Sequence, residues 1–317
     1  MKRTILALAV TSAFAGLAQA DDALTVYGKA NVSLQSTNEA GTNNFSELKS
    51  NASRFGLKGK TALDGGLEVF YKMEWEVDLT DKSKGSTDNI KSRNQIVGLR
   101  GNFGSIFVGR HDTPMKSVQK KIDLFNDYDG DMKHIINGEN RKSNILQYST
   151  KKLNGAFQAN VAFIPGEDPA NGNTGLADAT SASVTFDKNG LYLGVAYDSD
   201  VDGQNVKTTR FVSQFNRKAF QLGFLYENTD NGTNKENGYV TSGAYKMGKE
   251  TFKVQYADSK IWSLGVSSSN KYSTMTSVGW DHKLGKHTKV FTWYTNGELG
   301  ATSQNDKFVA VGLEHKF

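Results

Sequence analysis

Hydrophobic and polar residues alternate along most of the chain with a period of two. In FQANVAF, Phe157, Ala159, Val161 and Phe163 share one face, and the polar residues between them share the other. The segments LYLGVAY, FQLGFLYE and FKVQY follow the same pattern. A period of two is typical of β-strands with one apolar and one polar face, and helical spacing fits none of these segments.

Sixteen such segments predict sixteen strands, at residues 24–36, 52–62, 67–79, 92–102, 105–111, 143–150, 155–164, 180–187, 190–199, 206–216, 219–229, 238–246, 250–258, 271–283, 287–297 and 305–317. Tight links such as DKNG at 187–190 alternate with longer polar links such as 165–179. The Gly and Asn of the tight links supply the positive φ that hairpin turns need. Short turns at one end and long loops at the other indicate an antiparallel outer-membrane β-barrel.

Aromatic residues recur beside the tight turns. Phe157, Phe220 and Phe252 follow a turn directly, whereas Phe215 and Tyr245 precede one. Core packing would explain any one of these residues. Their recurrence at the same end of the hairpins favours an aromatic ring at the periplasmic membrane interface.

The composition supports a barrel with a wet lumen. Mean hydropathy is −0.52 and only 37% of residues are hydrophobic, which suits apolar faces directed at lipid and polar faces directed at water. The chain has no cysteine, which excludes disulfides and thiolate-bound metals. Beyond the N-terminal segment no run of 18 apolar residues is present, so no transmembrane helix is predicted. The basic residues are not clustered, and no nucleic-acid interface is expected.

The segment MKRTILALAVTSAFAGLAQA has the three parts of a secretory signal peptide: a basic start, an apolar run and a small-residue ending. We predict that residues 1–20 are cleaved and that residues 21–317 form one transmembrane β-barrel domain. The predicted mature chain has 36 Lys and Arg against 33 Asp and Glu, a net charge of +3.

Five stretches, in order, resemble the Gram-negative general diffusion porins of the neisserial and enterobacterial kind. They are LTVYGKANVSL at 24–34, SRFGLKG at 53–59, GLRGNFGSIFVGR at 98–110, NRKSNILQYST at 140–150 and VGLEHKF at 311–317. The resemblance covers nearly the whole predicted mature chain. It implies a homotrimer of 16-stranded barrels in the cell outer membrane, with the third extracellular loop of each barrel folded into its lumen.

The implied function is passive diffusion of small hydrophilic solutes and ions through a charged constriction. Implied partners are outer-membrane lipid and lipopolysaccharide, and the barrel-assembly machinery, which reads a terminal aromatic such as Phe317. Two alternatives remain open: a substrate-selective porin, for example one that prefers anions, and an adhesin or receptor barrel with a closed lumen. No cofactor is expected.

No enzymatic or metal-dependent activity is predicted. The five histidines lack zinc-ligand spacing, and no serine lies in an elbow motif. The segment DYDGDMKHIINGE departs from a calcium-binding EF-hand loop, because Met132 replaces the required glycine and Gly138 replaces the bidentate glutamate.

The longest link, residues 112–142, carries six acidic and six basic residues and is the candidate constriction loop. In the family that the chain resembles, basic wall residues face carboxylates of this loop. The matching wall positions are Lys29, Arg54, Arg110 and Arg141. Alternation independently directs Lys29 and Arg54 into the lumen, whereas the pattern around Arg110 does not decide its face.

The loop acids are assigned less directly, because the family's Pro-Glu-Phe-Gly-type signature is missing from the loop. IDLFNDYDGD is the expected replacement. It favours Asp123 and Asp127 as the acids that face the basic wall, with Asp131 and Glu139 behind them.

The segment VAVGLEHKF alternates up to Phe317. In a closed barrel the last strand pairs with the first and leaves no free edge. We therefore predict that residues 305–317 pair with residues 24–36.

Overall fold

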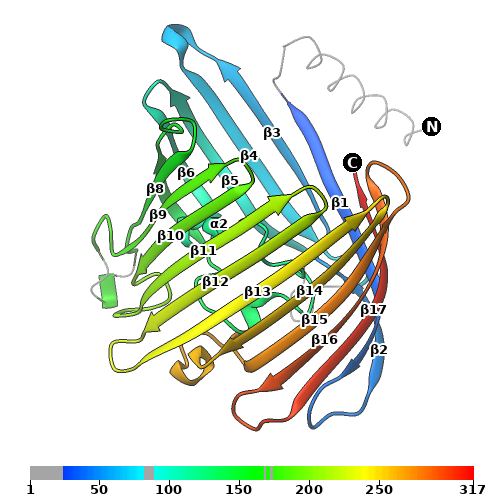
Figure 1. Ribbon diagram of the computed structural model, residues 1–317. Coiled ribbons are helices and arrows are strands. Elements are labelled where there is room, and N and C mark those ends of the chain that lie inside the picture. The colour runs from blue at the N-terminus through cyan, green and yellow to red at the C-terminus, as the bar shows by residue number, and fades with distance from the viewer. Residues whose placement is uncertain (1–23, 82–88, 168, 172–173) are drawn as a thin grey trace, which may run out of the picture.

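The computed structural model describes residues 24–81, 89–167, 169–171 and 174–317, so the predicted signal peptide lies outside the described residues. The chain forms a closed antiparallel β-barrel, with short turns at one end and long loops at the other (Figure 1). The strands are β1 (Thr25–Asn38), β2 (Phe45–Ser50), β3 (Arg54–Ala62), β4 (Glu68–Val77), β5 (Ile90–Gly101), β6 (Gly104–Asp112), β7 (Arg141–Ser149), β8 (Phe157–Ile164), β9 (Ala179–Lys188), β10 (Leu191–Ser199), β11 (Lys207–Arg217), β12 (Phe220–Asp230), β13 (Lys235–Met247), β14 (Glu250–Ser259), β15 (Tyr272–Lys283), β16 (Thr288–Leu299) and β17 (Asn305–Lys316).

These seventeen segments make sixteen barrel strands, which confirms the predicted number. Both β2 and β3 pair with β1, through Val32↔Ser50 and Lys29↔Arg54 respectively. Residues 51–53 therefore lie opposite residues 30–31, as in a β-bulge. The Ser53 hydroxyl fills the gap, accepting from the Asn31 amide at 2.9 Å and donating to the Asn31 carbonyl at 3.1 Å. The second strand, expected to begin at 52, thus begins at Phe45 and is bent once.

The barrel closes between β17 and β1, in a register that runs from Lys29↔Lys316 to Asn38↔Lys307. This pairing confirms the prediction made for the last strand. The amide of Gly28 donates to the Phe317 carbonyl at 2.8 Å, and the Phe317 ring lies against the glycine. A Cβ at residue 28 would lie 2.2 Å from that ring and 2.9 Å from the Arg54 carbonyl oxygen, so a larger residue here would displace the ring.

The outer surface is apolar. Along β17, Val309, Val311 and Leu313 are exposed, whereas Phe308 and Ala310, which alternate with them, are buried inside. At the periplasmic end, exposed aromatic rings from neighbouring strands touch, as in the pair Phe220–Tyr245 with centroids 4.7 Å apart. An apolar band edged by aromatic residues is the lipid-facing surface of a β-barrel. Among the described residues, no helix combines the length and the hydropathy needed to cross a membrane.

The third loop, residues 113–140, enters the lumen, as expected (Figure 1). It contains the short helix α2 (Pro114–Val118) and the 3-10 turn η2 (Met132–His134); the other 3-10 turns, at the barrel ends, are η1 (Asp64–Gly66), η3 (Pro169–Asn171) and η4 (Ile261–Leu264). One side of the loop is apolar and fully buried against the inner faces of β10–β17. The loop residues of these clusters are Met115, Val118, Ile122, Phe125, Tyr128, Met132, Ile135 and Ile136.

This packing makes part of the lumen dry, although a wet lumen was expected. Val212, Leu225 and Val240 point inward and have no exposed surface, because the loop covers them. Where the loop covers β10–β17 the interior of the barrel is therefore apolar and dry, whereas the wall along β1–β7 is polar, as are the periplasmic ends of β14–β17, where Lys253, Asp281 and Lys289 line a cavity.

Candidate functional site: a charged constriction

Two polar cavities lie beside the third loop: one between the loop and the wall from β2 to β7, the other on the periplasmic side of the loop, lined by β1, β3, β12 and β14–β17. The one toward the extracellular side has a volume of about 570 Å³, and the one toward the periplasmic side about 680 Å³. Both are lined by Arg54 and, from the third loop, by Gln119, Lys120, Asn126 and Asp127. The cavities meet at these five residues, which therefore mark the constriction between the two halves of the lumen.

Asp127 joins the loop to the wall at this point. Its Oδ2 accepts from the Lys29 Nζ at 2.8 Å and from the Arg54 guanidinium. Lys29 on β1 and Arg54 on β3 are directly paired in the sheet, so the two cations converge on one carboxylate. Burial alone would raise the pKa of Asp127, but the charges of Lys29 and Arg54 outweigh it and hold this pKa below its usual value. The structure thus brings together three of the predicted site residues.

Further ion pairs line the lumen on the extracellular side of the constriction. Arg93 on β5 donates to Glu74 at 2.9 Å and to Glu76 at 2.6 Å. Arg141 on β7 lies 3.0 Å from Asp112. The predicted residue Arg141 therefore lines the lumen, but its carboxylate partner comes from the wall and not from the third loop.

Two of the predicted loop acids organise the loop itself. Asp131 accepts from the backbone amides of Lys133 at 2.9 Å and Asp127 at 3.2 Å, and so supports the loop tip. Asp123 accepts from the amides of Phe125 at 2.9 Å and Met132 at 3.1 Å, and is buried. Burial, followed by the negative charge of Asp131, raises the pKa of Asp123 well above its usual value. Neither carboxylate contacts the predicted basic wall residues.

Glu139 faces the opposite side of the barrel. Its carboxylate lies 2.8 Å from Arg210 on β11, and Arg210 also pairs with Glu227 on β12 at 2.7 Å. The same guanidinium donates to the loop carbonyls of Met115 at 3.1 Å and Asn137 at 2.6 Å. Arg210 and Glu227 have no exposed surface. This buried cluster fastens the loop to the apolar wall along β10–β17.

Arg110 is not brought to the constriction. It lies at the register shift between Gly109 and His111, and it continues the face of the exposed residues Ile106 and Val108. Its guanidinium donates to the Ser143 hydroxyl at 2.8 Å, and it lines neither of the two polar cavities.

Several charged residues of the lumen were missed by the sequence analysis. Lys49 bonds Asp129 of the third loop at 2.7 Å, but it falls in a segment that was expected to be a loop. Arg93 lies at an irregularity of β5, where Met73 and Trp75 face Gln95 and Ser92, so simple alternation could not assign its face.

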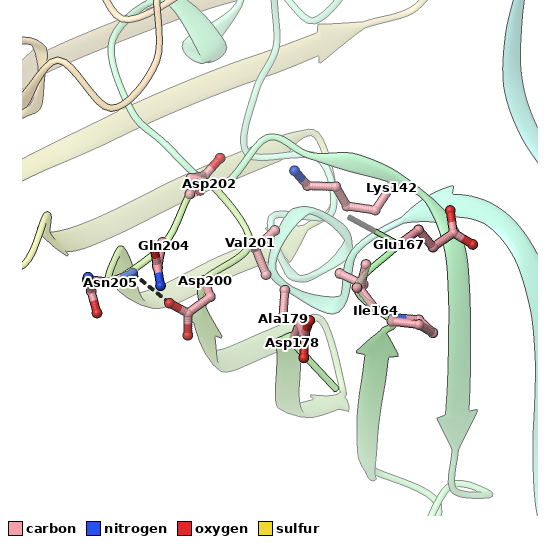
Figure 2. Close-up of a pocket in the computed structure, with 13 residues that line it drawn as sticks. Lys142, Ile164, Glu167, Asp178, Ala179, Asp200, Val201, Asp202, Gln204 and Asn205 are labelled. Carbon is pink, nitrogen blue, oxygen red and sulfur yellow. Dashed lines mark hydrogen bonds between the residues drawn. The ribbon is translucent and has the colours of Figure 1, made fainter. Parts of the chain in front are cut away.

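A further cavity, of about 860 Å³, opens among the extracellular ends of β7–β10 and is acidic (Figure 2). Its charged lining consists of Glu167, Asp178, Asp200 and Asp202, with Lys142 as the single base. Asp202 accepts from Asn140 of the third loop at 2.6 Å. In the part of the chain that the structure describes, no group of three or more His, Asp or Glu residues is arranged to hold a metal ion.

Comparisons with known proteins agree with this architecture. The family model described as "Gram-negative porin" matches residues 7–302. The major outer membrane protein P.IB of Neisseria sicca is 24% identical over 366 aligned residues that cover all of both chains. Among solved structures, the anion-selective porin from Comamonas acidovorans superposes with a TM-score of 0.75 at 20% identity, covering 94% of this chain and 100% of that one. Salmonella typhi OmpF superposes with a TM-score of 0.74 at 16% identity, covering 93% and 98%.

The two solved structures share the fold, and the family model shows the relationship, because it spans nearly the whole sequence. The chain therefore belongs to the Gram-negative porin family and forms an outer-membrane channel for the passive diffusion of solutes.

Proposed function

We propose that solutes cross this barrel through the two polar cavities, passing between the third loop and the basic wall at Lys29 and Arg54, and that the passage mildly favours anions. The anion preference is supported by the charge of the residues that line the two polar cavities. The two cavities that meet at Arg54 and Asp127 are lined by twelve Lys and Arg and by seven Asp and Glu.

In this proposal Lys29, Arg54, Arg141 and Asp127 set the field of the passage. Cations on the wall opposite a loop carboxylate orient water and polar solutes in a narrow slot with low-dielectric walls. Apolar solutes lose hydration there without compensation. The basic side chains hold anions only loosely, because most of them already have a carboxylate partner, so anions can leave as well as enter.

We further propose that the mature chain spans residues 21–317 and assembles as a homotrimer in a leaflet that contains lipopolysaccharide. Phe317 is the residue we propose for recognition by the barrel-assembly machinery. Family membership supports these assignments. We assign no catalytic role to the lumen, and the charged residues at the constriction serve transport.

Recording single channels in planar bilayers tests the proposal. We expect stable open channels. In a KCl gradient, we expect a reversal potential whose sign shows that chloride permeates more readily than potassium. A cation-selective reversal potential would overturn the anion preference, and absence of conductance would support a closed adhesin or receptor barrel instead. Block of the current by one solute at low concentration would favour the substrate-selective alternative.

A further inference from the structure

Charge is distributed unevenly along the axis of the barrel. At the periplasmic end, the turns and adjoining strand ends contain sixteen Lys and Arg and six Asp and Glu. These segments are residues 57–73, 99–105, 149–158, 186–191, 215–220, 245–253, 280–290 and 314–317. The formal side-chain charge of this end is therefore +10.

The extracellular end has the opposite sign. Its described loop segments contain seven Lys and Arg and fourteen Asp and Glu, a formal charge of −7. These segments are residues 38–49, 77–81, 89–91, 164–167, 174–179, 198–207, 228–238, 258–272 and 297–307.

Part of this charge faces the lumen or a cavity of the barrel. At the periplasmic mouth, Lys246 continues the inward-facing row of Ser242 and Ala244 on β13, and its side chain is exposed. Lys283 likewise follows the inward-facing row of β15. At the extracellular end, the acidic cavity among β7–β10 supplies four carboxylates and one lysine (Figure 2).

We infer that this polarity makes the channel a rectifier, which conducts more current when the extracellular side is positive. Fixed carboxylates concentrate mobile cations at the extracellular mouth, and fixed ammonium and guanidinium groups concentrate mobile anions at the periplasmic mouth. An extracellular-positive potential drives both populations toward the constriction, so carriers accumulate there. The opposite potential pulls both away and depletes it.

Rectification of this kind drives no solute against its gradient. It makes the permeability of the outer membrane to ions depend on the sign of the potential across it. The effect depends on unscreened charge: the Debye length is about 30 Å at 0.01 M salt and about 3 Å at 1 M. We therefore expect rectification at low salt and a symmetric current at high salt.

The test is the single-channel current at equal potentials of either sign, recorded at low and at high KCl. Orientation can be fixed with Thr233→Cys in an exposed extracellular loop, because the natural chain has no cysteine. A thiol-reactive biotin with streptavidin, added to one side, then reports which mouth faces that side. We expect a current ratio of about two at 0.01 M KCl, falling to near one at 1 M, as screening sets in.

Two matched triple variants separate axial polarity from total charge. Replacing Lys246, Lys283 and Lys286 with Gln removes three exposed positive charges from the periplasmic end, and we expect the current ratio to fall toward one. Replacing Lys207, Lys260 and Lys307 with Gln removes the same charge from the extracellular end; because Lys207 and Lys307 face outward, we expect the ratio to rise by less than it falls in the first variant. A symmetric current in the natural protein at low salt would overturn the inference. So would a shift of both variants in the same direction.

Discussion

Asp127 holds the third loop against the basic wall at the point where the two polar cavities meet. Its carboxylate is shared by Lys29 and Arg54, so this group of three residues carries a net positive charge. The sign of the constriction is thus set by residues on paired positions of β1 and β3, and a single substitution there alters the field in the passage.

Replacing Arg54 with Gln is expected to lower the preference for anions. A unit charge about 10 Å from an ion in water contributes about 0.4 kcal/mol, which is about a two-fold change in the local concentration of that ion. We expect the anion-to-cation permeability ratio to fall by roughly two- to four-fold, because both ion types respond. The reversal potential in a KCl gradient measures this change. Arg110→Gln is the matched control, since Arg110 lines neither cavity, and an equal shift in both variants would contradict the assignment of Arg54.

Asp123 makes the loop sensitive to pH in a defined direction. The pKa of Asp123 is raised in the folded protein. The protonated carboxyl therefore contributes stability that is fully present below the unfolded pKa of about 3.9, and this contribution is lost as the pH rises through the folded pKa. In Asp123→Asn this contribution is absent. We therefore expect the natural protein's advantage in thermal midpoint over the variant to shrink as the pH rises from acidic to alkaline. An advantage that grows with pH would contradict the raised pKa.

At the scale of elements, the third loop is held from two sides by different chemistry. Its apolar side packs on β10–β17, and the Arg210 cluster with Glu139 and Glu227 fastens it through charge. Its tip meets β1 and β3 through Asp127. The apolar side, packed on β10–β17, fixes the position of the loop. The polar side, which faces the cavities, defines the passage.

Arg210→Met is expected to loosen the loop. The substitution leaves Glu139 and Glu227 buried without their cation, which typically costs about 3–5 kcal/mol. Tryptic cleavage of the folded protein after the loop lysines, read by mass spectrometry, measures the loosening. The triple variant Arg210→Met, Glu139→Gln, Glu227→Gln should regain most of the resistance, because no unpaired charge remains. Equal cleavage of the natural and the Arg210→Met proteins would contradict a fastening role.

The strands were predictable from sequence because a barrel wall has lipid on one side and polar groups on much of the other, and this imposes strict alternation. Prediction failed where the alternation breaks. The start of the second strand is hidden by the bulge at 51–53, the face of Arg110 by the shift after Gly109, and the role of Arg93 by the irregularity in β5.

The loop acids were harder still to assign. A loop folded into a barrel has two sides, and the sequence does not say which acid faces which side. Asp127 faces the basic wall, whereas Glu139 faces Arg210 across the loop. A residue buried by the loop, such as Arg210, has the same alternation as any lumen residue, so its part in fastening the loop could not be foreseen.

At the scale of the whole molecule, the central claim is that at the constriction water and solutes pass on one side of the third loop only. Ser117 and Val118 are neighbours on α2 that lie on opposite sides of this boundary. Ser117 is exposed and lines the extracellular-side cavity, whereas Val118 is buried in the apolar cluster against β10 and β11. Since the chain has no cysteine, each position can carry the only thiol of the protein.

The most direct measurement is the single-channel current of Ser117→Cys and Val118→Cys while a small, charged, water-soluble thiol reagent is added. We predict that the reagent reduces the current through Ser117→Cys within seconds to minutes and leaves the current through Val118→Cys unchanged. Rapid modification of Val118→Cys, with Ser117→Cys unaffected, would place the water on the other side of the loop and contradict the account.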